Sequence, residues 1–183
     1  MMKMSEIISM LGLKQHPEGG FYKRIYTSTD MVTTVNPTCS KKERPCSTSI
    51  YYLLEKDEFS AWHRLKSDEQ WHHYEGNPVD IYAIDPKTKE LLHYKLGSIL
   101  DHKSPHILIK RGFWFCAQSI GTETGSYSFV GCTVTPGFDF DNYELAVRLA
   151  LISEYPEHRD MINRFTREKT DCARNNSTTI IQE

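Results

Sequence analysis

The sequence has 183 residues, a length suited to one domain with a sizeable hydrophobic core. Hydrophobic residues make up 39% of the chain and charged residues 25%, with a formal net charge of -2. This near-neutral balance, without a basic stripe, argues against nucleic acid or an anionic membrane surface as the main partner.

The N-terminal quarter is predicted to contain a helix, a strand and a long loop. Apolar residues at helical spacing predict a short helix over residues 4–13, which the Gly-rich segment 16–20 ends. Residues 21–28 have the pattern of a strand. Residues 29–45 carry Asn-Pro and a run of basic residues, and we expect a long mobile loop there.

From residue 47 onwards, short β-prone segments alternate with turn residues. The predicted strands are residues 47–54, 59–65, 70–75, 79–84, 91–96, 106–109, 113–118 and 127–134. Strands at this spacing, without intervening helices, predict an all-β sandwich or barrel rather than an α/β sheet.

The C-terminal part changes to a helical pattern. Leu145, Leu149 and Ile152 predict a helix from about Asn142 to Glu154, ended by Pro156. We expect a single domain over residues 1–168 and a frayed polar tail over residues 169–183.

The compartment is predicted to be cytoplasmic. Residues 1–13 lack the pattern of a signal peptide, and no apolar run approaches the length of about 18 residues that a membrane span requires. The five cysteines are odd in number and include no C-x-x-C pair. Reduced thiols are therefore a simpler interpretation than a disulfide framework or a zinc knuckle.

The chemistry-bearing residues gather around His63. Strand alternation puts His63 on one face with Phe59, Ala61 and Leu65, where it is the polar residue of an otherwise apolar face. It points either into a cavity or into the core, as a histidine hydrogen-bonded to a neighbour.

The spacing around His63 resembles the first motif of the cupin superfamily, which is Gly, five residues, His-x-His, three or four residues, Glu, six residues, Gly. His63, Glu69 and Gly76 match the first His, the Glu and the closing Gly. Leu65 replaces the second His, and Asp57 replaces the opening Gly.

The second cupin motif, Pro-x-Gly, two residues, His, is matched only at Gly112, because Lys110 and Phe115 replace the Pro and the His. Two of the usual four metal ligands are therefore missing, whereas a stable divalent site needs three or four converging donors. We expect no metal cofactor. The alternative is a divalent transition metal held by His63, Glu69 and His72, or by His73 in place of His72.

Five stretches resemble one branch, the fifth cupin family, a group of unknown function. They begin at His16, Thr48, His63, Gly112 and Val130 and together cover about residues 10–150 in the right order. The resemblance implies an all-β cupin jelly-roll barrel or sandwich with a short N-terminal helix and a C-terminal helix, commonly paired as a homodimer. It implies no established reaction.

The neighbours of Glu69 are ligand-binding candidates. Strand parity puts Trp71 and His73 on the face of Glu69 and His72 on the other, whereas the family motif singles out His72. A β-bulge near Gln70 would reconcile the two. Without a bulge, His72 meets a partner sheet or the dimer interface.

Glu18, Trp114 and Phe115 complete the ligand-binding candidates. Glu18 either reaches over the pocket from its Gly-rich segment or is a turn residue in solvent. Trp114 and Phe115 either stack on a planar ligand or belong to the core, which is the commoner role of aromatic residues in strands.

Three functions follow. The first is an isomerase or epimerase of a sugar or sugar phosphate. The cupin superfamily that the chain resembles includes metal-independent sugar-nucleotide epimerases, and these use a barrel histidine as general base and a tyrosine as acid. His63, with an ordinary pKa near 6.5, would be the base, with Glu69 or Tyr51 as its partner. The second is a non-catalytic module that binds a carbohydrate-like small molecule, and the third is a metal-dependent isomerase or dioxygenase. We rank the metal-free site first.

Overall fold

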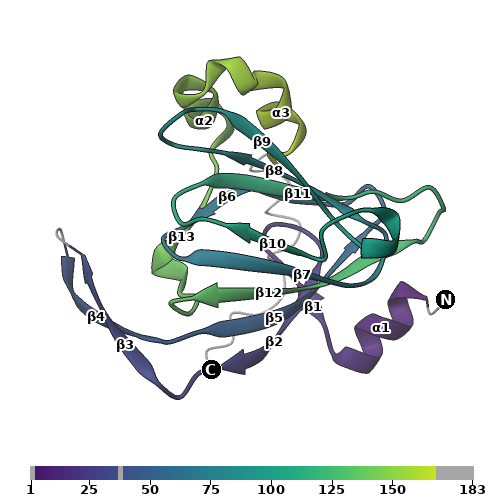
Figure 1. The fold of residues 1–183 in the computed structure, drawn as a ribbon, viewed down its shortest axis with the longest axis horizontal. Coiled ribbons are helices and arrows are strands. Elements are labelled where there is room, and N and C mark those ends of the chain that lie inside the picture. Colours follow the sequence, from purple (N-terminus) through teal and green to yellow (C-terminus); the bar gives the residue numbers. More distant parts are fainter. Residues whose placement is uncertain (1–2, 37–38, 168–183) are drawn as a thin grey trace.

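The computed structural model describes residues 3–36 and 39–167, which form two antiparallel sheets packed face to face (Figure 1). The larger sheet, in the order β1-β2-β5-β12-β7-β10, consists of β1 (Lys14–Gln15), β2 (Phe21–Thr27), β5 (Thr48–Glu55), β7 (Asp68–Gly76), β10 (His106–Ile109) and β12 (Tyr127–Thr135). The smaller sheet, in the order β13-β6-β11-β8-β9, consists of β6 (Phe59–Leu65), β8 (Val79–Ile84), β9 (Leu91–Leu96), β11 (Trp114–Ser119) and β13 (Tyr143–Leu145). The predicted all-β jelly-roll class is confirmed.

The α-helices are short and lie towards the two ends of the chain, and short 3₁₀ turns occur among the strands and near the C-terminal helices. The α-helices are α1 (Met4–Leu11), α2 (Arg148–Glu154) and α3 (Arg159–Arg164), and the 3₁₀ turns are η1 (Ile99–Asp101), η2 (Phe140–Asn142) and η3 (Pro156–His158). The predicted helices near both ends are thus present, and the C-terminal one ends at Glu154, before Pro156, as predicted. The helix α3 was not predicted. Within the described ranges, no helix has the length and apolar character needed to cross a membrane.

The apolar residues form three cores. The central core lies between the sheets, where Tyr52 and Trp71 of the larger sheet meet Ile81 and Phe115 of the smaller one. On the outer face of the smaller sheet, α2 and α3 pack over Trp62, Ile84, Trp114 and Cys116. On the outer face of the larger sheet, α1 packs over Leu53 and Tyr127. The outer face of each sheet is therefore partly covered by a helix.

The expectation of a long loop over residues 29–45 is wrong. This segment forms an antiparallel hairpin of β3 (Met31–Asn36) and β4 (Cys39–Pro45), which extends away from the body of the molecule (Figure 1). The Asn-Pro pair that suggested a loop begins where β3 ends. At the base of the hairpin, the buried Arg44 side chain donates hydrogen bonds to the carbonyl oxygens of Pro136 and Gly137.

The expectation of a helix from Asn142 is also wrong over its first turns. Residues of β13 pair with β6, in the register Tyr143↔Leu65 to Leu145↔His63, so the edge of the smaller sheet captures this segment as a strand. The helix α2 begins only at Arg148. Pairing with a sheet edge here overrides the helical spacing of the apolar residues. The predicted tail over residues 169–183 lies outside the described residues.

Candidate functional site

A cavity of about 500 Å³ lies between the two sheets. The strands β1, β2, β5, β6, β7 and β12 all contribute lining residues, together with the segment that follows β12. Both residues that dominate the sequence prediction, His63 and Glu69, line this cavity. They come from different sheets, so the sandwich brings together two groups that neither sheet alone would place in one site.

An irregularity in β6 sets the direction of His63. The pairing of β6 with β11 shifts register between Ser60 and His63, which inserts an extra residue in β6. Ser60 and His63 therefore both reach the cavity side, where Ser60 hydrogen-bonds Glu18, whereas Phe59 and Trp62 pack in the outer core with the C-terminal helices. The strict alternation that placed Phe59 beside His63 is wrong at this point.

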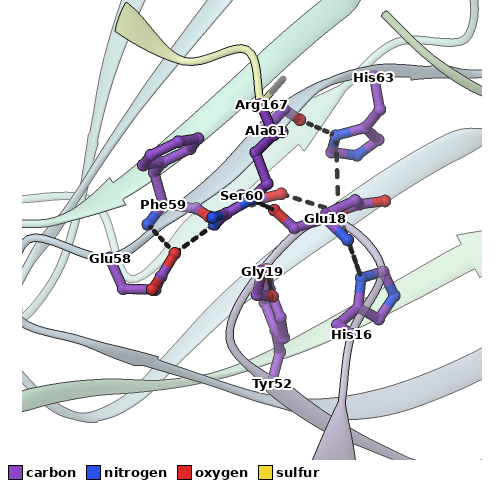
Figure 2. A network of polar contacts seen from close by, with 10 residues as sticks. All are labelled: His16, Glu18, Gly19, Tyr52, Glu58, Phe59, Ser60, Ala61, His63 and Arg167. Atoms are coloured by element: carbon purple, nitrogen blue, oxygen red, sulfur yellow. Dashed lines mark hydrogen bonds and ion pairs between the residues drawn. The ribbon is translucent and has the colours of Figure 1, made fainter. Parts of the chain in front are cut away.

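His63 is buried, with 2% of its surface exposed, and makes two contacts through Nδ1 (Figure 2). This atom lies 2.7 Å from the Ala61 carbonyl oxygen and 3.5 Å from Oε2 of Glu18. A carbonyl only accepts hydrogen bonds, so Nδ1 carries the proton and Nε2 remains as the acceptor. Burial lowers the pKa of His63 to about 4, and the ring is therefore neutral at pH 7.

Glu18 reaches the cavity from the Gly-rich segment between β1 and β2. Its carboxylate accepts a hydrogen bond of 2.7 Å from Oγ of Ser60 and lies 3.7 Å from Nδ1 of His16. Burial raises the pKa of Glu18, while His16 and the hydroxyl groups of Ser60 and Tyr143 act in the opposite direction. The Glu18 side chain therefore lies in the cavity and not in solvent.

Glu69 lies on β7, in the sheet that faces His63 across the cavity. Burial raises the pKa of Glu69 to about 8, and the nearby charge of Glu18 adds to the effect. Its Oε2 is buried and has no hydrogen-bond partner among the described residues. The carboxyl group is therefore protonated at pH 7 and can donate a hydrogen bond to a ligand. Two carboxyl groups in one enclosed space resist joint ionisation.

Tyr51 lies on the wrong face for a partner of His63. Its ring packs against Tyr74 and Phe129, on the face of β5 that points away from the cavity. The next residue, Tyr52, lines the cavity instead and donates a hydrogen bond of 2.7 Å to the Gly19 carbonyl oxygen. Strand parity separates the two tyrosines, and parity relative to His63 could have identified Tyr52.

The candidates on β7 divide between its two faces. The pairing with β12 is regular from Asp68 to His73 and shifts only beyond His73, so there is no bulge near Gln70. His72 faces outward, where its ring stacks on His106 at a centroid distance of 4.8 Å. His73 does not line the cavity, and its Nε2 lies 3.1 Å from the Asn77 carbonyl oxygen. Glu69 and Trp71 are the β7 residues that line the cavity.

Trp114 and Phe115 belong to the cores. Trp114 packs with Trp62 beneath the Arg64 guanidinium, 4.5 Å from its ring centroid, on the far side of the smaller sheet. Phe115 lies between the sheets, with its ring centroid 4.0 Å from that of His63. Neither residue lines the cavity, so Phe115 supports the His63 ring rather than a ligand.

The residues present do not fit the divalent metal centre common in cupin barrels. Leu65 lines the cavity and Phe115 backs His63 where ligands are usual, and His72 faces the opposite side of its sheet. Across residues 3–36 and 39–167, no three His, Cys, Asp or Glu side chains converge as metal ligands do. The polar contacts of His63 are instead made with Glu18 and the Ala61 carbonyl oxygen, and those of the Glu18 carboxylate with Ser60, His16 and His63.

Three basic side chains, those of Lys14, Lys23 and Arg24, line the cavity, and Lys23 donates a hydrogen bond to the Leu11 carbonyl oxygen. Lys14 of β1 and Arg24 of β2 are exposed, and neither forms a salt bridge within the described parts of the chain. The Arg24 guanidinium lies 5.8 Å from the ring centroid of Phe138, which also lines the cavity. Neither these basic residues nor His16 was predicted as a site residue, because single Lys, Arg and His residues carry no distinctive spacing.

Comparison with known proteins gives a consistent result. Residues 5–146 match the sequence model of the family described as cupin superfamily (DUF985). A crystal structure of a protein from Shewanella oneidensis is 35% identical, with a TM-score of 0.77, and covers 92% of this chain and all of its own. A hypothetical protein from Leishmania major is 27% identical, with a TM-score of 0.82 and coverages of 91% and 100%.

More distant structures share the fold alone. Oxalate decarboxylase from Bacillus subtilis is 9% identical, with a TM-score of 0.51, and the match covers 85% of this chain and 37% of the decarboxylase. No curated protein matches the sequence.

Proposed function

The chain belongs to the cupin superfamily (DUF985), and we propose that it is an isomerase or epimerase that acts, without a metal, on a sugar phosphate bound between its two sheets. The observation that carries this proposal is the opposite displacement of two pKa values in one cavity. The pKa of His63 is lowered to about 4, and the pKa of Glu69 is raised to about 8. At neutral pH the cavity thus offers an unprotonated imidazole and a protonated carboxyl group.

These two groups have the roles that proton transfer beside a carbonyl group requires. Nε2 of His63 removes the proton from the carbon next to the carbonyl, and the C–H electron pair forms the double bond of an enediol. The Glu69 carboxyl group donates its proton to the carbonyl oxygen, so no free oxyanion accumulates. In an isomerase the proton on His63 goes to the former carbonyl carbon, while the other enediol hydroxyl gives its proton to the Glu69 carboxylate and becomes the new carbonyl. In an epimerase a proton from solvent water reaches the original carbon from the opposite face, the former carbonyl oxygen returns its proton to Glu69, and His63 releases its proton to water.

Glu18 supports the imidazole in this scheme. Its carboxylate lies 3.5 Å from Nδ1 of His63 and stabilises the imidazolium that forms when Nε2 accepts a proton. Burial lowers the pKa of His63, and its hydrogen bond with the Ala61 carbonyl oxygen acts in the opposite direction. The buried Ser60 hydroxyl group fixes the carboxylate on its other side.

The outer part of the cavity supports the choice of an anionic substrate. Lys14 and Arg24 are positive charges without a carboxylate partner in the described chain, whereas the two carboxyl groups lie at the inner end. A phosphate group that binds these cations leaves the sugar in the same cavity that His63 and Glu69 line.

Exchange of carbon-bound hydrogen with solvent tests the reaction. The purified protein is incubated in heavy water with a panel of aldose and ketose phosphates, each paired with the same sugar without phosphate. We expect a mass increase of one deuterium in a phosphorylated substrate, and none in its unphosphorylated partner. A ligand that stays bound through purification but never exchanges hydrogen would instead support a binding module and contradict the proposal.

A further inference from the structure

Arg167, near the C-terminal end of the described residues, holds the backbone that carries Glu18 (Figure 2). Its Nε donates a hydrogen bond of 3.1 Å to the Glu18 carbonyl oxygen. Its Nη2 donates one of 2.9 Å to the Phe59 carbonyl oxygen and pairs with the Glu58 carboxylate. One guanidinium group therefore connects the Gly-rich segment, the start of β6 and the C-terminal segment.

The packing around the Arg167 guanidinium leaves no room for a side chain at position 19. Gly19 has a φ angle of 118°, and a Cβ atom there would collide with both the Arg167 guanidinium and the Phe59 carbonyl oxygen. The Arg167 guanidinium also lies over the Phe59 ring, 4.3 Å from its centroid. The segment that carries Glu18 thus contacts Arg167 at the level of the backbone.

The residues before Arg167 are attached to the same strand. The Trp62 backbone N–H donates to the Phe165 carbonyl oxygen at 2.9 Å, and the Trp62 indole N–H donates to the Met161 carbonyl oxygen at 3.0 Å. Arg167 is consequently held against β6 on the side opposite to the cavity-facing His63. This C-terminal segment lies beyond residues 5–146, to which the family resemblance extends.

We infer that Arg167 is a positioning residue, which fixes the main chain at residues 18 and 19 so that the Glu18 carboxylate stays beside His63 and Ser60. The Ala61 N–H donates a hydrogen bond of 3.0 Å to the same Glu18 carbonyl oxygen that Arg167 contacts. Two donors on one carbonyl oxygen define the direction of the Glu18 residue, and the side chain then spans to Ser60 at 2.7 Å and His63 at 3.5 Å.

Arginine suits this place for a geometric reason. The planar guanidinium presents several N–H groups in fixed directions, so it can serve two carbonyl oxygens and one carboxylate together. A lysine at this position has a single ammonium centre and cannot reach all three acceptors in the same geometry. The consequence for turnover rests on the proposed function, whereas the consequence for Glu18 and its two histidine neighbours does not.

The test compares Arg167→Ala with Arg164→Ala in the ligand-free protein. Arg164 is the matched control, because it lies in the same C-terminal segment and its guanidinium also lies over an aromatic ring, 4.9 Å from the Phe165 centroid. Its hydrogen bond goes to the Gln118 side chain and not to the backbone that carries Glu18. The readout is the set of ¹⁵N imidazole resonances of the histidines. In Arg167→Ala we expect the His16 and His63 resonances to move while those of His72 and His93 stay in place. Millimolar guanidinium should return them to their wild-type positions, and Arg164→Ala should leave all four unchanged.

Unchanged His16 and His63 resonances in Arg167→Ala would overturn the inference. Equal movement of all histidine resonances, without rescue by guanidinium, would also overturn it, because that pattern indicates general loosening. Should Arg167→Ala not fold, Arg167→Lys keeps the charge, and movement confined to His16 and His63 is again the expected result. Any other pattern in Arg167→Lys counts against positioning.

Turnover provides the second readout. A displaced Glu18 should lower kcat by roughly 10- to 100-fold, the usual cost of misplacing a supporting group by about 1 Å, with little change in KM. If the resonances move as expected but the wild-type protein exchanges no substrate hydrogen, positioning by Arg167 stands and the proposed function fails.

Discussion

The two faces of the larger sheet carry similar side chains in opposite surroundings. On β5, Tyr52 faces the cavity and bonds the Gly19 carbonyl oxygen, whereas Tyr51 packs outward against other aromatic rings. On β7, Glu69 faces the cavity, whereas His72 stacks on His106 at the outer surface. A shift of one residue along a strand therefore decides whether an ionisable group enters the proposed site.

Burial has larger electrostatic consequences on the inner face. It penalises charge of either sign, so it lowers the pKa of His63 and raises the pKa of Glu69. On the outer face, burial and the neighbouring His106 lower the pKa of the partly exposed His72. The inner face of the larger sheet borders the cavity, where Glu69 meets the His63 imidazole of the smaller sheet and the Glu18 carboxyl group. The following predictions test this difference between the two faces.

The largest expected difference is between His63→Gln and His72→Gln. In the first variant, the glutamine amide keeps a donor toward the Ala61 carbonyl oxygen but removes the proton acceptor. We expect turnover to fall by roughly 10²–10⁴-fold, the contribution of a positioned general base. The melting temperature should change little. His72→Gln should leave turnover unchanged, because the ring lies outside the cavity.

Deuterium exchange and thermal melting of both variants separate the alternatives. A lower stability of about 1 kcal/mol in His63→Gln, with turnover per folded molecule intact, would mean that His63 is a core residue with a satisfied hydrogen bond. Loss of turnover in His72→Gln would contradict the distinction between the two faces.

The second difference appears in the pH dependence of stability. Glu69 has a folded pKa of about 8, above its ordinary unfolded value of about 4.3, so the folded state binds more protons between these pH values. The stabilisation is present below about pH 4.3 and is lost as the pH rises through about 8. Glu69→Gln carries no charge to bury, so we expect it to be more stable than the wild type at pH 9, by on the order of 2–4 kcal/mol.

Urea unfolding between pH 5 and pH 9 measures this effect, with about one pH unit between points. Glu123→Gln is the control, because Glu123 lies exposed in the loop between β11 and β12. A constant stability difference between the wild type and Glu69→Gln across this range would show that the Glu69 carboxyl group is not buried as an acid.

The sequence was informative where local pattern and tertiary pairing agree. The strands from β5 to β12 were predicted within about two residues, because alternating apolar residues and strong turn residues coincide there. The same alternation, combined with the cupin motif, pointed to His63 and Glu69. These features depend on spacing, which a single sequence contains.

The remaining features depend on contacts that the spacing does not contain. The extra residue between Ser60 and His63 reverses the parity of Phe59, and it arises from the pairing with β11. The strand β13 exists because the edge of β6 is available for pairing. Arg167 reaches Glu18 across 149 positions of sequence, so no local pattern links the two residues.

A smaller difference is expected between Tyr52→Phe and Tyr51→Phe. The first variant removes the hydroxyl group that bonds the Gly19 carbonyl oxygen at 2.7 Å, and a lost hydrogen bond of this kind costs about 1 kcal/mol. Tyr51 contributes its ring, which phenylalanine keeps, so the second variant should remain within about 0.5 kcal/mol of the wild type. Urea unfolding measures both values. Equal losses in the two variants would mean that the hydrogen bond from Tyr52 to the Gly19 carbonyl oxygen contributes no stability.

The smallest effect is expected from metal removal, and it tests both faces together. A centre built from His63, Glu69 and His72 would need donors from the two opposite faces of β7, and the regular pairing of this strand with β12 keeps those faces apart. Treatment with a chelator should therefore leave turnover and melting temperature unchanged, and elemental analysis should give less than one transition-metal ion per chain. One tightly held ion per chain, lost together with turnover on chelation, would mean that β7 changes its pairing to turn His72 inward. In that case the assignment of His63 as a metal-free base would be wrong, and Glu69 would be a ligand rather than an acid.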